Sequence, residues 1–351
     1  MKALIAPDSF GDTLTAVAAA EAIAAGWALG RPDDELTLVP QSDGGPGFVA
    51  VLASRFGEIQ RATVAGPLGA AVSAEWLLDD RGGRRIAYVE CAQACGLHQL
   101  GGAPTPRTAL TADTFGVGQL VVEAARAGAD EIVVGLGGSG STDGGRGLVD
   151  ALGGLTEAAA LLRSVSLVAA SDVENPLLGP DGAAAVFGPQ KGADPETVAV
   201  LEEGNAEWAQ ALSGLAGRNV AGEPGAGAAG GLGAALLALG ATRVPGATII
   251  AGATGQAGLI GSADVVITGE GKFDEQTLKG KVVAALTSAA RTQGIPTIVL
   301  AGQVALTPAQ IAEAGIARAR AIIEVAGSVQ VAMDDAENQL IELARQVAEA
   351  W

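Results

Sequence analysis

Aspartates beside paired glycines are the side chains of this 351-residue chain best suited to chemistry. Asp43 lies in Ser-Asp-Gly-Gly-Pro-Gly, and Asp143 lies in Thr-Asp-Gly-Gly-Arg-Gly. Glycine lets backbone N–H groups point at an anion, and a nearby carboxylate can hold Mg²⁺ or take a proton from a hydroxyl. The two loops therefore predict catalysis on a magnesium–nucleotide complex. The structural alternative for each aspartate is an Asx turn or a helix N-cap.

The segment before the second aspartate is a glycine loop of the kind that binds phosphate. Ile132 to Val134 predicts a short buried strand, and Gly137, Gly138 and Ser139 follow it. The loop also fits G-x-G-x-x-G, which is typical of dinucleotide-binding dehydrogenases. A dinucleotide fold needs an acidic residue at the end of a second strand about 20 residues later, and the sequence has a helical pattern there. A dehydrogenase is therefore the minor alternative.

Further polar clusters follow other predicted strands. Asp172 and Asn175 precede Pro176 at one strand end and are candidates for a metal or substrate site. Lys191, between Gln190 and Gly192, is a candidate phosphate contact, because lysine carries a compact positive charge. A last segment, Thr268 to Gly280, mixes carboxylates, lysines and glycines and predicts a loop with a binding role.

Composition limits the partners of the chain. The net charge of −18 argues against nucleic acid or an anionic membrane, both of which attract clustered lysine and arginine. Cys91 and Cys95 have no second pair to complete a metal site, and His98 is the single histidine. Two free thiols and the lack of a signal peptide predict a cytoplasmic protein. No Walker A motif and no protein-kinase motif occurs.

The elements that position these residues predict an α/β fold with two domains. Strands and helices alternate at both ends of the chain, whereas residues 63–89 predict an antiparallel meander. We expect a Rossmann- or flavodoxin-like parallel-sheet domain of residues 1–65 plus 262–351. Residues 66–261 form an inserted α/β domain with antiparallel strands and the glycine-rich loops. Near the C-terminus the apolar run Ala321–Val325 predicts a strand.

In this order, the motifs are similar to the bacterial-type glycerate kinase family. The resemblance rests on short segments spread over about residues 1 to 330, namely Ala6-Pro7-Asp8-Ser9-Phe10, Ser42-Asp43-Gly44-Gly45, Gly137-Gly138-Ser139, Asp143-Gly144-Gly145, Asp172-Val173, Gly188-Pro189-Gln190-Lys191-Gly192 and Gly269-Glu270-Gly271 with Asp274 and Lys281. It implies two α/β domains and ATP-dependent phosphorylation of D-glycerate to phosphoglycerate in an inter-domain cleft.

The resemblance implies roles for the matching residues and two cofactors, ATP and Mg²⁺. Asp43, Asp143 and Lys191 would be catalytic, and Asp172 would hold the metal ion. Substrate-binding residues would be Asp8, Ser9, Asp172 and Asn175. Nucleotide-binding residues would be Gly137, Gly138, Ser139, Glu270, Asp274 and Lys281. The assignment of base and metal ligand among the aspartates, the hydroxyl that is phosphorylated and the oligomeric state, including a homodimer, are left open.

Three features depart from the family pattern. Gly11 stands where the family has lysine, Pro46 stands where it has glutamate, and the segment near residues 153–166 is shorter. The first two changes remove one positive and one negative group from neighbouring strand ends. They motivate the alternative of a non-catalytic or substrate-altered relative that binds a small hydroxy acid or a nucleotide.

Overall fold

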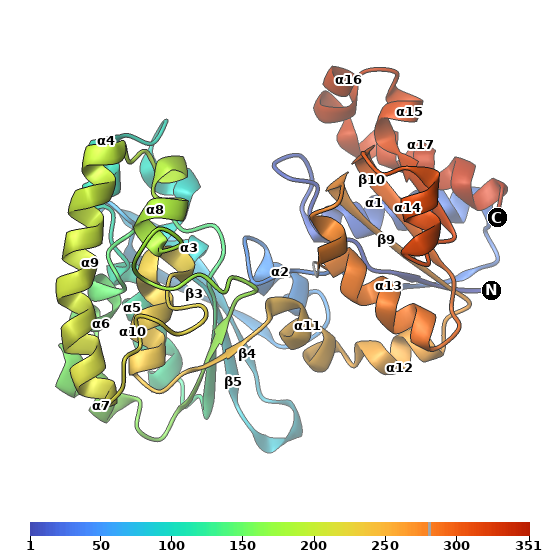
Figure 1. The fold of residues 1–351 in the computed structure, drawn as a ribbon. Coiled ribbons are helices and arrows are strands. Elements are labelled where there is room, and N and C mark those ends of the chain that lie inside the picture. Colours follow the sequence, from blue (N-terminus) through green and yellow to red (C-terminus); the bar gives the residue numbers. More distant parts are fainter. Residues whose placement is uncertain (280–281) are drawn as a thin grey trace. The chain divides into compact units, whose positions relative to one another are not determined.

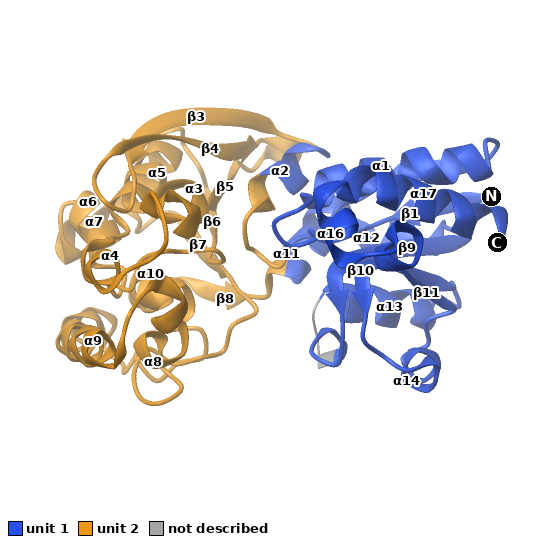
Figure 2. Cartoon of the chain, turned by 90° about the horizontal axis from the view of Figure 1, so that it is seen from above, with its two compact units in different colours: residues 1–42, 50–55, 247–351 blue, residues 43–49, 56–246 orange. Residues whose placement is uncertain are grey.

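The structure, a computed structural model, describes residues 1–279 and 282–351. The chain forms two compact units, shown in Figure 2. Unit 1 comprises residues 1–42, 50–55 and 247–351, and unit 2 comprises residues 43–49 and 56–246. The domain boundaries expected from the sequence, at 65/66 and 261/262, stay a prediction.

Unit 1 contains a parallel sheet. In the described residues its strand order is β11-β10-β9-β1-β2, and every neighbouring pair is parallel. The strands are β1 (Lys2–Ile5), β2 (Glu35–Leu38), β9 (Val265–Phe273), β10 (Thr297–Val304) and β11 (Arg318–Ala321). All carboxyl ends therefore lie at one edge of the sheet, which is where ligands bind in open α/β sheets.

Helices cover both faces of this sheet (Figure 1). One face packs against α1 (Ala16–Gly30), α15 (Ile322–Ala326), α16 (Val329–Asp334) and α17 (Ala336–Glu349). The other packs against α11 (Gly246–Thr254), α12 (Gln256–Gly261), α13 (Val282–Thr292) and α14 (Pro308–Glu313), and a short turn of 3₁₀ helix covers Thr277–Lys279. Helices α1 and α17 approach closely, because a Cβ at Gly26 would lie 2.1 Å from the Ile341 carbonyl oxygen.

Unit 2 contains a mixed sheet of strand order β3-β4-β5-β6-β7-β8 in the described part of the chain. β3, β4 and β5 pair antiparallel, and β5 to β8 pair parallel. The strands are β3 (Glu58–Ala65), β4 (Ala71–Asp79), β5 (Ile86–Glu90), β6 (Glu131–Gly135), β7 (Ser166–Ala170) and β8 (Thr242–Val244). The α/β class, with a parallel-sheet part and a part containing antiparallel strands, is confirmed.

The core of unit 2 lies between this sheet and a layer of helices. α3 (Ala92–Cys95), α5 (Phe115–Arg126), α6 (Arg146–Ala151) and α10 (Leu232–Ala238) contribute buried side chains to it. The remaining helices are α4 (Pro106–Thr111), α7 (Leu155–Leu161), α8 (Ala183–Phe187) and α9 (Pro195–Ala216), and 3₁₀ turns occupy Arg81–Gly83, Leu97–Leu100, Pro189–Lys191 and Ala228–Gly231. Helix α2 (Phe48–Ala53) begins in unit 2 and ends in unit 1.

Two local predictions are wrong. The expected loop over Thr268–Gly280 is strand as far as Phe273, because β9 continues to pair with β10 through Phe273 and Val304. The expected strand over Ala321–Val325 is helix α15, preceded by β11. The Glu324 carboxylate accepts a hydrogen bond from the Ala321 N–H and so caps this helix, which overrides the strand preference of the apolar run.

Candidate functional site

The two glycine loops at the strand ends of unit 2 pack against each other. The Gly137 N–H donates to the Gly44 carbonyl at 3.0 Å, and a Cβ at Gly137 would lie 2.3 Å from the Cα of Gly45. Pro46 covers Gly138, where φ is +72° and a Cβ would meet the proline ring at 2.5 Å. Glycine alone fits this approach of two backbones. The structure thus brings the first aspartate loop to the loop predicted to hold phosphate.

A buried carboxylate holds the first loop in place. Glu90, at the end of β5, is 2% exposed, and its Oε2 accepts hydrogen bonds from the N–H groups of Gly47 at 3.0 Å and Val49 at 3.3 Å. Burial raises the pKa of Glu90 above its ordinary value, although the backbone donors favour the charged form. Sequence reasoning missed Glu90. The available signal was a lone carboxylate that directly follows an apolar strand.

Asp43 and Asp172 influence each other electrostatically. Asp43 is exposed and its Oδ1 accepts from the Gly45 N–H at 2.9 Å, so it also makes the Asx turn that was the structural alternative. Asp172 follows β7. Partial loss of hydration, and then the negative charge of Asp43, raise the pKa of Asp172 to about 6. Gly246 packs on the Asp43 backbone, because a Cβ at Gly246 would lie 2.1 Å from the carbonyl carbon and oxygen of Asp43.

This carboxylate pair suits a magnesium ion. Mg²⁺ in phosphoryl-transfer sites is held by one or two carboxylates, with phosphate oxygens and water completing the shell. The negative charge that raises the pKa of Asp172 would be offset by a divalent cation bound beside it. In the described residues no group of three or more His, Cys, Asp or Glu side chains is arranged to hold a metal.

Asp143 is engaged in holding its own loop. Its Oδ2 accepts from the Thr114 N–H at 2.9 Å, the Thr114 hydroxyl at 2.8 Å and the Gly147 N–H at 3.0 Å. Its Oδ1 accepts from the Gly145 N–H at 3.1 Å. Thr114 in turn accepts from the Leu148 N–H, so one carboxylate ties the start of α6 to the start of α5. Thr114 carries no motif that would have revealed this role from the sequence.

Lys191 lies beneath the glycine loop of β6 and is buried at 2% exposure. Its Nζ donates to the Ser139 hydroxyl at 2.8 Å and to the Ser141 carbonyl at 2.6 Å. Burial lowers the pKa of Lys191 to about 8, because the surrounding protein disfavours the charged form. An ammonium group has three donors, so in the described part of the chain one donor stays available for a ligand oxygen.

A cavity of about 330 Å³ opens over this lysine. Gly137, Gly138, Ser139 and Lys191 line it, as predicted for a phosphate site, and Ala229 completes the wall. Ala229 has φ +51°, and it is the one non-glycine residue with positive φ among those described. Such strain is uncommon outside functional sites, which adds Ala229 to the candidates. The structure therefore brings the loop and the lysine together at one cavity, and phosphate binding there stays a prediction.

The other predicted residue of unit 2, Asn175, takes part in local structure. Its Nδ2 donates to the Asp181 carbonyl at 2.8 Å, and its own carbonyl accepts from the Gly227 N–H at 2.9 Å. These contacts hold the turn after β7. A role of Asn175 in substrate binding stays a prediction.

In unit 1, the predicted residues gather near the carboxyl ends of β1 and β9. Asp8 follows β1, and its N–H donates to the Gly269 carbonyl at 2.8 Å, which places Asp8 and Ser9 beside β9. Glu270 accepts from the Thr277 hydroxyl at 2.5 Å. Asp274 forms an ion pair with Lys272 at 3.2 Å, and a hydrogen bond from the Gln276 N–H lowers its pKa. Lys281 lies outside the described residues.

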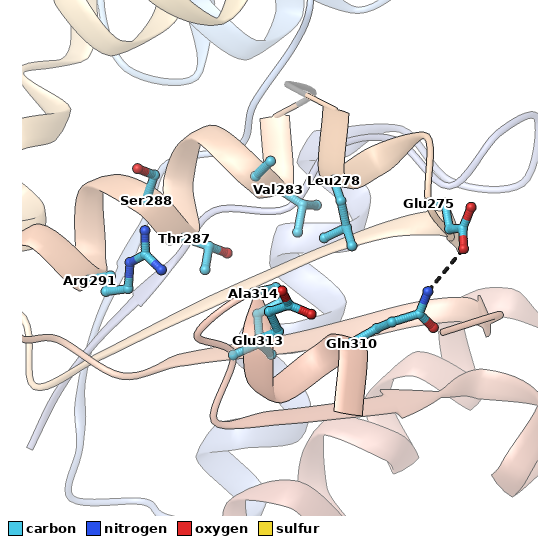
Figure 3. Close-up of a pocket in the computed structure, with 11 residues that line it drawn as sticks. Glu275, Leu278, Val283, Thr287, Ser288, Arg291, Gln310, Glu313 and Ala314 are labelled. Carbon is cyan, nitrogen blue, oxygen red and sulfur yellow. Dashed lines mark hydrogen bonds between the residues drawn. The ribbon is translucent and has the colours of Figure 1, made fainter. Parts of the chain in front are cut away.

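Unit 1 also has a cavity of about 460 Å³ between α13 and α14 (Figure 3). Glu275 and Gln310, joined by a hydrogen bond of 2.9 Å, lie at one end of it, and Arg291 lies at the other. None of the predicted site residues lines this cavity. No helix of the described chain is long and apolar enough to cross a membrane.

Comparisons with known proteins agree with one another. The model of the "Glycerate kinase family" matches residues 3–159 and 154–351. An uncharacterized protein of Mycobacterium tuberculosis is 58% identical, over 99% of this chain and 91% of its own length. A glycerate kinase of Halalkalibacterium halodurans is 38% identical over 98% of this chain and 97% of its own length. A glycerate 2-kinase of Escherichia coli is 33% identical over 99% of this chain and 97% of its own length.

A solved structure is similar over the whole chain. The crystal structure of a glycerate kinase 2 from Salmonella typhimurium LT2 superimposes with a TM-score of 0.80 at 34% sequence identity. The superposition covers 100% of this chain and 98% of the Salmonella chain.

Proposed function

This chain belongs to the glycerate kinase family, a family of phosphotransferases, and from that premise we propose that it transfers the γ-phosphoryl group of ATP to a hydroxyl of glycerate. The expected products are phosphoglycerate and ADP. Relatives that carry the name glycerate kinase, at 33–38% identity over the full length, support the acceptor. The hydroxyl that reacts is left open between the 2- and the 3-position.

The observation that carries the proposal is Lys191 beneath the glycine loop. A buried ammonium bonded to Ser139, with one donor left for a ligand, is suited to neutralise charge on a transferred phosphoryl group. The glycines of the loop leave backbone N–H groups near the same cavity. Phosphoryl transfer needs chiefly positioning and charge neutralisation, and this arrangement offers both.

Magnesium, when it is bound with ATP, would neutralise charge on the ATP phosphates, and Asp172 would hold it. An acceptor hydroxyl that attacks the γ-phosphorus must lose its proton as the bond to ADP breaks. Asp43 is exposed and is the candidate to take that proton. Asp143 accepts four hydrogen bonds from its own loops, and for it we propose a positioning role.

For the acceptor we propose Asp8 and Ser9. For the nucleotide we propose Glu270 and Asp274 in addition to Gly137, Gly138 and Ser139. Asn175 and Lys281 remain predictions from the resemblance, as do the position of the reaction between two domains, a homodimer and a cytoplasmic location.

The proposal is tested by a coupled assay of ADP release with purified protein, Mg²⁺, ATP and D-glycerate, extended to L-glycerate, lactate and tartronate. We expect turnover with D-glycerate that depends on Mg²⁺. Thermal stabilisation by ATP or glycerate without ADP release would favour the non-catalytic alternative. In that case Gly11→Lys combined with Pro46→Glu should create activity.

A further inference from the structure

A small apolar cavity of about 220 Å³ lies at the carboxyl ends of β9 and β10 in unit 1. Gly271 of β9 and Gly302 of β10 form part of its wall, together with Phe10 and Gly11 from the segment after β1. A Cβ at Gly302 would lie 2.4 Å from the Gly271 carbonyl oxygen, and a Cβ at Gly271 would lie 3.2 Å from the Gly11 nitrogen. Neighbouring backbone therefore covers both glycines on the side where a Cβ would stand. Apolar side chains, among them Phe10, Ile322 and Met333, supply much of the remaining lining, which suits a planar apolar ring.

Beyond Ala301, the edge of β10 that faces β11 has no partner strand in the described residues. β11 pairs with β10 only as far as Ala301, whereas β10 runs on to Val304. At Ile322 the chain leaves β11 and enters α15, and Ile322 and Ile323 line the cavity. Alternate residues of a strand direct their N–H and C=O groups to opposite edges. One of Gly302 and Gln303 therefore presents a backbone donor and acceptor that β11 does not use.

Apolar side chains of α16 stand at the rim of the cavity. Val329 is 44% exposed and Met333 is 57% exposed, and both line it (Figure 1 shows α15 and α16). Exposed large apolar side chains around a hollow are typical of a surface that a ligand covers. A ring that is apolar on its faces and polar along one edge matches an apolar slot with an unused strand edge.

One carboxylate lies at the mouth of the cavity. Asp12 lines it and is exposed, and in the described residues it has neither a hydrogen-bond nor an ion-pair partner. Carboxylates at this edge of α/β sheets accept hydrogen bonds from ribose hydroxyls. A carboxylate would repel phosphate, so the phosphates of a nucleotide must point away from it.

We propose that this cavity binds the adenosine part of the nucleotide, with the adenine ring against Gly271 and Gly302 and a ribose hydroxyl donating to Asp12. The inference rests on the proposed function for the identity of the nucleotide. It assigns binding to residues outside the glycine loop and the lysine, namely to a strand edge, two glycines and one carboxylate of unit 1.

The first test fills the cavity. Ala332→Trp places an indole in it, and Ala314→Trp, in the cavity between α13 and α14, is the matched control. By isothermal titration with ADP, Ala332→Trp should bind at least tenfold more weakly than the wild type, and Ala314→Trp should bind within twofold. Circular dichroism and the melting temperature without ligand establish that each variant is folded. A folded Ala332→Trp variant that binds ADP like the wild type would overturn the proposal.

The second test reads the ribose contact and uses a surface substitution that leaves the fold intact. A hydrogen bond to a charged group is worth about tenfold or more in affinity. Wild type should therefore bind ADP about tenfold more tightly than either 2′-deoxy-ADP or 3′-deoxy-ADP. In Asp12→Asn, whose amide oxygen accepts only a neutral hydrogen bond, this preference for ADP should fall to about threefold or less. Equal discrimination by wild type and Asp12→Asn would refute the ribose contact.

The two proposals fail in different ways. If ATP-dependent turnover of glycerate is observed and Ala332→Trp leaves the KM for ATP unchanged, the cavity is not the adenosine site and the proposed function stands. If the wild type neither binds ADP nor consumes ATP, the nucleotide itself is wrong and both proposals fall.

Discussion

Lys191 is the residue on which the chemistry depends most. It is buried, and it contacts the hydroxyl and the carbonyl of two residues of one loop, Ser139 and Ser141. A buried lysine costs hydration energy and is retained where its charge or its donors are used. Its neighbours are also unusual, because the Ser141 and Thr142 hydroxyls are buried without a hydrogen-bond partner among the described residues. Such groups are expected where a ligand completes the network.

Lys191→Met should lower kcat/KM by about 100-fold or more, because it removes a preorganised charge from the phosphate site. The wild-type pKa of about 8 means that the ammonium form is present below pH 8 and is lost above it. The profile of kcat/KM against pH should therefore fall above about pH 8. The control is Lys2→Met, which replaces an exposed lysine at the start of β1 and should change the rate less than twofold. A full rate in Lys191→Met would remove the lysine from the mechanism.

Asp172→Asn should lower activity and raise stability. The pKa of Asp172 rises on folding, from 3.8 to about 6, so its contribution to stability is present below pH 3.8 and is lost as the pH rises through 6. Because the side chain is exposed, we expect a gain of only about 1 kcal/mol at pH 7, vanishing near pH 4. Urea unfolding at both pH values measures the gain. Unchanged turnover would argue against Asp172 as a magnesium ligand.

At the scale of elements, the site depends on how strand ends hold loops. Glu90 at the end of β5 fixes the loop that carries Asp43 and the start of α2. Asp143 fixes the starts of α5 and α6 in the same way. Each carboxylate satisfies backbone N–H groups that helix starts leave unpaired. We therefore expect the geometry of the site to depend on these two acidic residues through the loops that they hold.

Glu90→Gln and Glu90→Leu separate this positioning role from simple folding. Both N–H groups donate to the same oxygen of Glu90, so the single amide oxygen of Gln can accept from both, and Glu90→Gln should lower kcat less than tenfold. Leu leaves both N–H groups without an acceptor and should cost about 2 kcal/mol of unfolding free energy. It should also lower kcat more than tenfold with little change in KM for ATP. Equal kcat in the two variants, measured with both fully folded, would show that Glu90 acts on stability alone.

The sequence predicts the elements of the site better than the contacts within it. Regular strands followed by glycine loops place Asp43 and Gly137 near strand ends because the local pattern is strong, whereas Lys191 lies in a 3₁₀ turn after α8. The packing of Pro46 on Gly138 could not be predicted, because it joins segments about 90 residues apart. The same holds for Glu90, whose partners lie 41 and 43 residues away. Extension of β9 was missed because pairing with β10 outweighs the preference of glycine for turns.

At the scale of the molecule, each unit has a hydrophobic core of its own. Unit 2 is built on one extended cluster that includes Leu120, and unit 1 is built on clusters on the two faces of its sheet, one of which includes Leu340. The chain nevertheless passes between the units at 42/43, 49/50, 55/56 and 246/247. Separate cores predict that local damage stays within one unit.

Leu340→Ala and Leu120→Ala test this separation. Both side chains are fully buried, so each change should cost about 3 kcal/mol. Hydrogen exchange measured by mass spectrometry should speed up mainly in unit 1 peptides for Leu340→Ala and mainly in unit 2 peptides for Leu120→Ala. Matching acceleration in both units by either variant would mean that the chain unfolds as one cooperative body.

The central claim, phosphoryl transfer from ATP to glycerate, is tested most directly by following the phosphorus itself. ³¹P NMR of the wild type with Mg²⁺, ATP and D-glycerate should show phosphoglycerate and ADP appearing in equal amounts, and Lys191→Met should show neither at a comparable rate. ADP and inorganic phosphate without phosphoglycerate, or no consumption of ATP at all, would contradict the claim.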